Sequence, residues 1–169
     1  MTVGALEGRV TWLNTLHIWT TSYLGNLVGG IVLALMMVLS GLATAGTTGE
    51  FILEVSASKM GAPFVELLFR GILCNILVCL AVWLALKVED KTATLILIFW
   101  CLFAFIGAGF EHSVANMTLF AVALFIPHSP AVSWAGFVGN LVPVTIGNII
   151  GGAVFVGAAY WYVGNGRSA

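Results

Sequence analysis

The sequence predicts an all-α integral membrane protein, and three observations lead to that fold class. Hydrophobic residues make up 60% of the 169 residues and charged residues only 8%, whereas about 25% charged is usual in soluble domains. The mean hydropathy is +1.08. The apolar residues also gather into long segments, and a transmembrane helix needs about 20 of them. We therefore expect a single transmembrane domain over residues 1–169 and no soluble domain.

Four apolar segments are predicted to cross the bilayer: Leu16–Leu39, Phe64–Leu86, Leu95–Ile126 and Trp134–Tyr162. The last two exceed one perpendicular crossing, and an overlong segment can tilt or divide into half-helices. The polar run Glu111–Asn116 predicts a break in the third segment, and Pro143 with Asn148 predicts an irregularity in the fourth. The segment Ser40–Pro63, rich in Gly, Thr and Ser, is predicted to be an external loop.

The distribution of cations predicts the orientation in the membrane. With four crossings, both termini lie on the same side. Four cations are expected on that side and two on the other: Arg9, Lys87, Lys91 and Arg167 against Lys59 and Arg70. Because cytoplasmic loops carry the excess of Lys and Arg, we expect a multi-pass membrane protein with cytoplasmic termini.

Composition also excludes several classes of protein. The net charge of -1 offers no basic surface for nucleic acid. The three cysteines, Cys74, Cys79 and Cys101, form neither a CxxC pair nor a metal-ligand spacing, and we interpret them as packing residues. No metal or other cofactor is expected.

Glu111 and His112 interrupt the third apolar segment near its middle. A carboxylate at the bilayer centre costs about 2.5–3.5 kcal/mol on insertion scales unless water or protein surrounds it, so such groups usually mark a transport or proton pathway. A haem held by two histidines is the rival interpretation, and it predicts a membrane electron-transfer subunit. His17 and His128 lie near segment ends, which disfavours a pair with His112 at the midplane.

A six-residue pattern occurs twice, in the first and fourth segments. Gly25–Gly30 reads GNLVGG and Gly147–Gly152 reads GNIIGG. The two segments are predicted to run in opposite directions, as expected for an inverted-topology repeat. The second repeat would then comprise three spans, Phe64–Tyr162, whereas the first has only its third, so two further spans are expected before it. Small residues recurring for helix packing are the alternative explanation.

These residues resemble the formate/nitrite transporter family. The resemblance rests on Phe110–Met117, on Arg70–Asn75 and on Asn140–Gly152 continuing into Tyr160–Tyr162. The continuation Met117–Phe120 and the upstream Trp100–Leu102 resemble the nitrite branch more than the formate branch. The resemblance covers Thr20 to Val163.

Membership would imply an aquaporin-like inverted-repeat fold and transport, not enzymatic catalysis. Members have six spans in each protomer and assemble as homopentamers that conduct nitrite or formate, with or without protons. This chain would supply spans three to six. The first span and the broken second span, whose loop supplies a threonine facing the central histidine, would be absent. An inactive, truncated transporter is therefore an alternative to a working one.

The resemblance assigns the pore or substrate contacts to five residues: His112 as the central histidine, Phe105 as a constriction, Asn75 and Asn148 near the central site, and Lys59 beside a vestibule. For the two asparagines, a hydrogen bond that joins neighbouring helices is an equal alternative. For Lys59, the alternative is a solvated position in a loop.

Two further polar residues are expected to support the broken helix. Glu111 adjoins His112 and cannot share its helix face, so we expect its carboxylate to accept hydrogen bonds from freed backbone N–H groups or from Asn75, with proton transfer as the alternative. Asn116 is expected to share this role. Glu66 and Arg70, at i,i+4 spacing, are predicted to form an ion pair.

Overall fold

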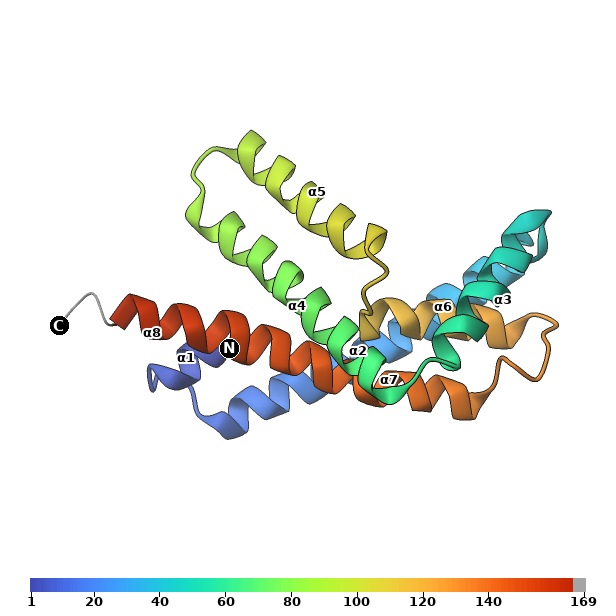
Figure 1. The fold of residues 1–169 in the computed structure, drawn as a ribbon, viewed down its shortest axis with the longest axis horizontal. Helices are drawn as coiled ribbons and strands as arrows, with labels where there is room; N and C mark the ends of the chain where they lie inside the picture. Colours follow the sequence, from blue (N-terminus) through green and yellow to red (C-terminus); the bar gives the residue numbers. More distant parts are fainter. Residues whose placement is uncertain (166–169) are drawn as a thin grey trace.

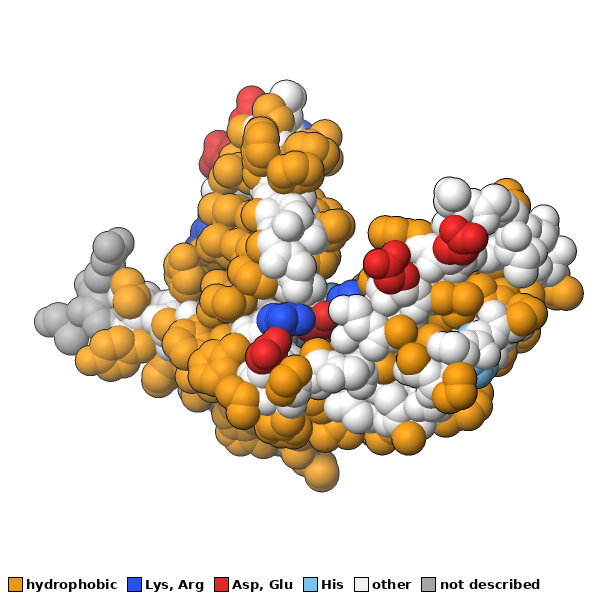
Figure 2. All heavy atoms as spheres, turned by 45° about the vertical axis from the view of Figure 1, so that its right-hand side comes forward, with side chains coloured by type: hydrophobic (Ala, Val, Ile, Leu, Met, Phe, Trp, Pro, Cys, Tyr) orange, Lys and Arg blue, Asp and Glu red, His pale blue; other side chains and the backbone are white. Residues whose placement is uncertain are grey.

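Helices account for all the regular structure of residues 1–165, the part of the chain that the computed structural model describes. Three helical stretches are long and apolar enough to cross a membrane: Trp12–Leu39, Phe64–Lys87 and Trp134–Gly164. Hydrophobic side chains dominate the face shown in Figure 2, and charged side chains gather in a few places on it. The chain is therefore a membrane protein. Arg167, one of the cations used to predict the orientation, lies outside the described residues.

The first part of the chain forms the long helix α2, the shorter helices α1 and α3, and one 3-10 turn. The short helix α1 (Thr2–Leu6) precedes α2 (Trp12–Leu39), and the side chain of Thr11 accepts a hydrogen bond from Asn14 N at the start of α2. A 3-10 turn, η1 (Leu42–Thr44), leads into α3 (Thr47–Met60). The prediction of an external loop over residues 40–63 is therefore wrong in its main part, because α3 packs against α6 and buries Ile52.

The remaining part of the chain begins with α4 (Phe64–Lys87) and returns along it as α5 (Lys91–Gly107). Asp90 starts α5 by accepting a hydrogen bond from Ala93 N. After a break, α6 (Ser113–Phe125) continues toward α3, so that α5 stands out as an arm that lies along α4 (Figure 1).

The last helix runs back through the molecule without a sharp kink. It consists of α7 (Trp134–Ile149), the π-helical η2 (Ile150–Ala158) and α8 (Ala159–Asn165). The α-helical form of α7 continues through Pro143, and the irregularity begins at Ile150, two residues after Asn148, where the turns widen to the π-helical form. As predicted, α2 and α7 run in opposite directions (Figure 1), and the N-terminal α1 packs against η2 near the C-terminal end.

Three glycines, one in each of the contacting helices α4, α7 and η2, allow α4 to pack closely on the other two. A Cβ atom on Gly71 would collide with the carbonyl oxygen of Val144, and Cβ atoms on Gly147 and Gly151 would collide with those of Leu68 and Ile72. Without Cβ atoms the two backbones can approach closely, which is how membrane helices gain packing contacts in the absence of a hydrophobic driving force.

The hydrophobic core lies around α6, away from the contact of α4 with the last helix. One cluster joins α2, α3 and α6, and a second joins α6 and α7. The buried members of the two clusters are Ala34, Ala43, Ile52, Ala121, Val122, Ala123, Ile126 and Val132, and Met117, Phe120, Phe137 and Leu141. This core holds α6 in place and thereby fixes the position of the break before it.

Candidate functional site

The break between α5 and α6 covers five residues, Ala108–His112. The predicted polar run therefore divides: Glu111 and His112 lie in the break, whereas Ser113–Asn116 form the first turn of α6. Gly109 has φ +71, a left-handed conformation that glycine adopts without steric cost. The N–H of Phe110 bonds to the carbonyl of Phe105 at 3.0 Å, and that of Glu111 to the carbonyl of Arg70 at 3.3 Å.

Asn148 holds the chain on both sides of His112. Its Nδ2 donates to the carbonyl oxygens of Glu111 and Gly71, both at 2.9 Å. Its Oδ1 accepts from the backbone N and the Oγ of Ser113, both at 3.0 Å. Because an amide has two donors and two acceptor lone pairs, all four positions of this side chain are used. Asn148 thus supplies the backbone partners that a broken helix loses, which a lipid environment requires.

Asn75 supports the same place from α4. Its Nδ2 donates to the backbone oxygen of Asn148 at 2.5 Å. The prediction had offered Asn75 as a hydrogen-bond partner of Glu111, and that alternative is wrong. Asn75 instead steadies the helix that carries Asn148.

Glu111 is 1% exposed, and its carboxylate is paired within the protein. Oε1 lies 2.7 Å from Nζ of Lys59, and Oε2 accepts from Nδ2 of Asn116 at 2.6 Å. The freed backbone N–H groups that were expected to bind this carboxylate do not do so. Lys59 lies in α3 with its side chain 22% exposed, so the solvated loop lysine is also excluded.

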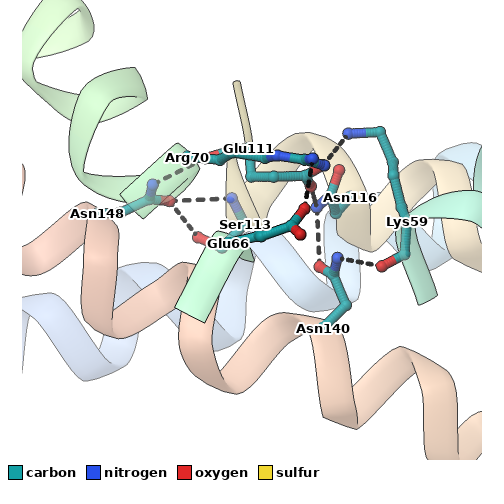
Figure 3. A network of polar contacts seen from close by, with 8 residues as sticks. All are labelled: Lys59, Glu66, Arg70, Glu111, Ser113, Asn116, Asn140 and Asn148. Carbon is teal, nitrogen blue, oxygen red and sulfur yellow. Dashed lines mark hydrogen bonds and ion pairs between the residues drawn. The ribbon is translucent and has the colours of Figure 1, made fainter. Parts of the chain in front are cut away.

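A fourth residue, Asn140 of α7, closes this network (Figure 3). Its Oδ1 accepts from Nδ2 of Asn116 at 2.9 Å, and its Nδ2 donates to the backbone oxygen of Lys59 at 3.0 Å. The sequence interpretation had not assigned Asn140 a role. Its position eight residues before Asn148, about two helical turns, was the available signal, because it places both amides on one side of an apolar helix.

The predicted ion pair between Arg70 and Glu66 is present, with Nη2 of the arginine 2.7 Å from Oε2 of the glutamate. Both side chains are largely exposed. The pair therefore lies beside the buried network and does not enter it (Figure 3).

His112 itself is only partly engaged. Its Nδ1 accepts from the backbone N of Ala115 at 3.4 Å, so the ring forms the N-cap of α6. Within residues 1–165, Nε2 has no hydrogen-bond partner. The ring centroid lies 6.1 Å from that of Phe105, with a tilt of 35°. The two residues predicted to share a conduit are thus neighbours, although the chain bends between them.

A groove of about 670 Å³ extends from the break toward α1. Its walls come from α1, α2, α4, α7 and η2, and they include Asn75, Ser113 and Asn148. His112, Phe105 and Lys59 do not line it. Within the described chain, the five predicted contact residues therefore fall into two groups: Asn75 and Asn148 in the groove wall, and His112, Phe105 and Lys59 outside it.

The other histidines lie away from the break. His17 belongs to the second turn of α2 and His128 to the connection after α6. Residues 1–165 contain no group of three or more His, Cys, Asp or Glu side chains arranged to hold a metal.

A family model described as "Formate/nitrite transporter" matches residues 1–162. The chain belongs to the formate/nitrite transporter family. A nitrite transporter NirC from Salmonella typhimurium is 44% identical over 162 residues, which are 96% of this chain and 60% of that protein. The chain thus spans less than two thirds of the length of this relative. The family comprises transporters and channels, not enzymes.

Solved structures agree with the family assignment. A structure titled "FNT family ion channel" is 44% identical and superposes with a TM-score of 0.91, covering 96% of this chain and 65% of that one. A structure titled "Pentameric formate channel with formate bound" is 32% identical, with a TM-score of 0.83 over 92% of this chain and 69% of that one. The helical fold with an interrupted segment is therefore that of this transporter family.

Proposed function

We propose that this chain forms part of the wall of a conduit for small monovalent anions, with nitrite as the preferred substrate and formate as the second. The observation that carries the proposal is the state of His112: its neighbours on both sides are held by Asn148, while its own Nε2 has no partner within the described chain. A ring whose flanking backbone is fixed in this way and whose second nitrogen is free is suited to meet a permeating molecule.

The start of α6 adds to this suitability. The N-terminus of a helix carries a partial positive charge that stabilises an anion, and His112 is the N-cap of this helix. Glu111 lies next in sequence, but Lys59 pairs with its carboxylate. The negative charge that would repel an anion is thereby compensated close to the break.

Proton exchange gives a second reason for a histidine here. A charged ion is costly in an apolar constriction, whereas the neutral acid formed when nitrite or formate takes up a proton is not. Imidazole can donate and accept a proton near neutral pH. Phe105, packed beside the ring, is the apolar residue that would narrow the path.

The protein is proposed to work as a homopentamer in a bacterial inner membrane, with its termini in the cytoplasm. The related structure whose title names a pentameric formate channel supports the assembly. The relative named as a nitrite transporter supports nitrite as substrate. Native mass spectrometry of the purified protein tests the assembly, and a tetramer or a monomer would contradict it.

Flux into proteoliposomes tests the transport proposal. We expect the uptake of nitrite to exceed that of formate. His112→Ala should lower nitrite flux at least about tenfold, because the site of proton exchange is lost. Phe105→Ala should change the flux and reduce the selectivity between the two anions. His17→Ala and Phe103→Ala are matched controls that remove the same side chains from α2 and from the exposed face of α5. Flux equal to that of empty liposomes, with a folded protein, would contradict transport and favour an inactive fragment. Equal flux of the two anions would contradict the preference for nitrite.

A further inference from the structure

The last helix changes its hydrogen-bond spacing shortly after Asn148. At the end of α7 the N–H of Ile150 bonds to the carbonyl of Ile146, four residues back, whereas at the end of η2 the N–H of Ala159 bonds to that of Val154, five residues back. Nine consecutive residues have the π-helical form. Such turns are rare, usually occur singly and are frequent at functional sites. A stretch of this length therefore needs a local cause.

A side chain from α4 enters the helix at this point. Nδ2 of Asn75 donates to the backbone oxygen of Asn148 at 2.5 Å. In an α-helix this oxygen would accept from the N–H of Gly152, four residues ahead. A side chain inserted into this ladder of bonds is a recognised cause of helix irregularity. The amide of Asn75 thus competes for the acceptor just before the turns widen.

Gly152 gives the amide of Asn75 the room that it occupies. A Cβ atom on this glycine would lie 2.7 Å from Nδ2 of Asn75 and 2.8 Å from Sγ of Cys79, so a larger residue would push the amide away. The neighbouring Gly151 lies against the backbone of Ile72 instead. The two adjacent glycines therefore serve different partners, one the main chain of α4 and the other its side chains.

The wider turns also determine which side of the last helix faces α4 at its C-terminal end. A π-turn closes with about one residue more than an α-turn, so nine such residues rotate everything that follows them relative to a continuous α-helix. With this rotation the ring of Tyr160 lies against that of Trp83, with the centroids 4.9 Å apart. Gly152, Ala153 and Val156 of the same stretch line the groove. The helix form therefore sets both the groove wall and the aromatic contact.

We propose that Asn75 is a positioning residue whose amide holds the carbonyl of Asn148 and keeps Ile150–Ala158 in the π-helical form. This role differs from the substrate contact that the resemblance assigned to Asn75. Asn148 bonds to the backbone on both sides of His112, so the same contact joins the form of the last helix to the position of the break. Without the amide, we expect the stretch to become α-helical and to turn Tyr160 away from Trp83.

Fluorine NMR of the full chain labelled with 5-fluorotryptophan tests this proposal. The chain has six tryptophans, and the resonance that disappears in Trp83→Phe identifies the reporter. Tyr160→Leu gives the position of that resonance without the neighbouring ring. We expect Asn75→Ala to shift the Trp83 resonance most of the way to that position, because the carbonyl of Asn148 becomes free for an α-helical bond. An unchanged resonance would overturn the proposal.

Cys79→Ala is the matched control. It removes the other side chain that crowds Gly152 and leaves the amide of Asn75 in place, so the Trp83 resonance should not move. A shift equal to that of Asn75→Ala would show that crowding around Gly152, and not the amide, sets the helix form. Gly152→Ala tests the contact in a chain that keeps Asn75: the added methyl group displaces the amide, and the same shift is expected.

Electron cryo-microscopy of the Asn75→Ala protein determines the spacing directly. Hydrogen bonds to the residue four positions back are expected throughout residues 150–158, and bonds to the residue five positions back would overturn the role of Asn75. None of these measurements involves an anion. A protein that transports neither nitrite nor formate would still give them, so this proposal and the proposed function fail independently.

Discussion

The two halves of the interrupted segment, α5 and α6, are both apolar and yet have different surroundings. In α6, Met117, Phe120 and Ala121 are almost fully buried among α2, α3 and α7. In α5 only Thr94 is buried, and the large side chains Phe99 and Trp100 are more than half exposed. In a membrane, lipid solvates an apolar side chain as well as protein does. Hydrophobicity therefore identifies a membrane helix without indicating its neighbours.

The polar residues, in contrast, mark the place where the two halves are joined to the rest of the protein. Every hydrogen bond or ion pair from α3, α4 and α7 to this segment ends between Glu111 and Asn116. The difference between α5 and α6 can be tested by removing these contacts one at a time, beginning with the most heavily bonded residue.

Asn148→Leu is expected to have the largest effect. It leaves the carbonyl groups of Glu111 and Gly71 and the N–H of Ser113 without partners, at about 1–3 kcal/mol for each, or about 3–9 kcal/mol in total. Thermal unfolding of the purified protein in detergent, followed by tryptophan fluorescence, measures the loss. Asn14→Leu, at an exposed position near the start of α2, is the control and should unfold as the unmodified protein does. A small effect of Asn148→Leu would mean that α6 is held by its apolar core alone.

Lys59→Met is expected to come second. The carboxylate of Glu111, 1% exposed, would lose its cation, and breaking a buried ion pair in this way costs about 3–5 kcal/mol. The double variant Lys59→Met with Glu111→Gln should recover much of the stability in the same unfolding assay, since no unpaired charge remains. Arg70→Met breaks the exposed pair with Glu66 instead and should cost only about 0–1 kcal/mol. If Lys59→Met and Arg70→Met lost the same stability, the buried network would not be what anchors α6.

Gly151→Ala is expected to have an intermediate effect. The added Cβ atom would collide with the carbonyl oxygen of Ile72 in α4, and overpacking of this kind costs about 1–3 kcal/mol. Because α5 packs mainly on α4, the melting temperature should fall together with protection of α5 from proteolysis. Gly139→Ala, where no atom lies within 4 Å of the new Cβ, is the matched control. An equal response of both variants would contradict backbone-to-backbone packing at Gly151.

Phe99→Ala is expected to have the smallest effect, within about 0.5 kcal/mol, because the side chain is exposed on α5 and surface substitutions rarely change stability more. Phe120→Ala removes the same atoms from the buried face of α6 and should cost about 3–5 kcal/mol. Chemical unfolding of both variants in the same detergent gives the comparison. A comparable loss for Phe99→Ala would show that this face of α5 is covered by another subunit in the assembled protein.

By itself, the sequence determined the features that depend on local composition and short-range pattern. The high apolar content placed the chain in a membrane, the polar run predicted a break near His112, and the doubled GNxxGG pattern predicted two antiparallel helices. The i,i+4 pair of Glu66 and Arg70 was also predictable, because a regular helix sets that spacing whatever lies around it. Family motifs then identified His112 and Phe105 as the residues to test.

The sequence predicted that Glu111 and Asn116 support the break, but the tertiary structure decided which partners they bind and added Asn148, Lys59 and Asn140 to the support. Asn148 reaches Ser113 across 35 positions and Lys59 reaches Glu111 across 52, and the sequence interpretation assigned neither pair. It also missed α3, because a segment rich in Gly, Thr and Ser becomes helical when one face of it can pack on α6. The physical reason is the same in each case: a buried amide, ammonium group or weakly apolar face gains stability from whichever partner the path of the chain brings near, and that path is a property of the whole fold.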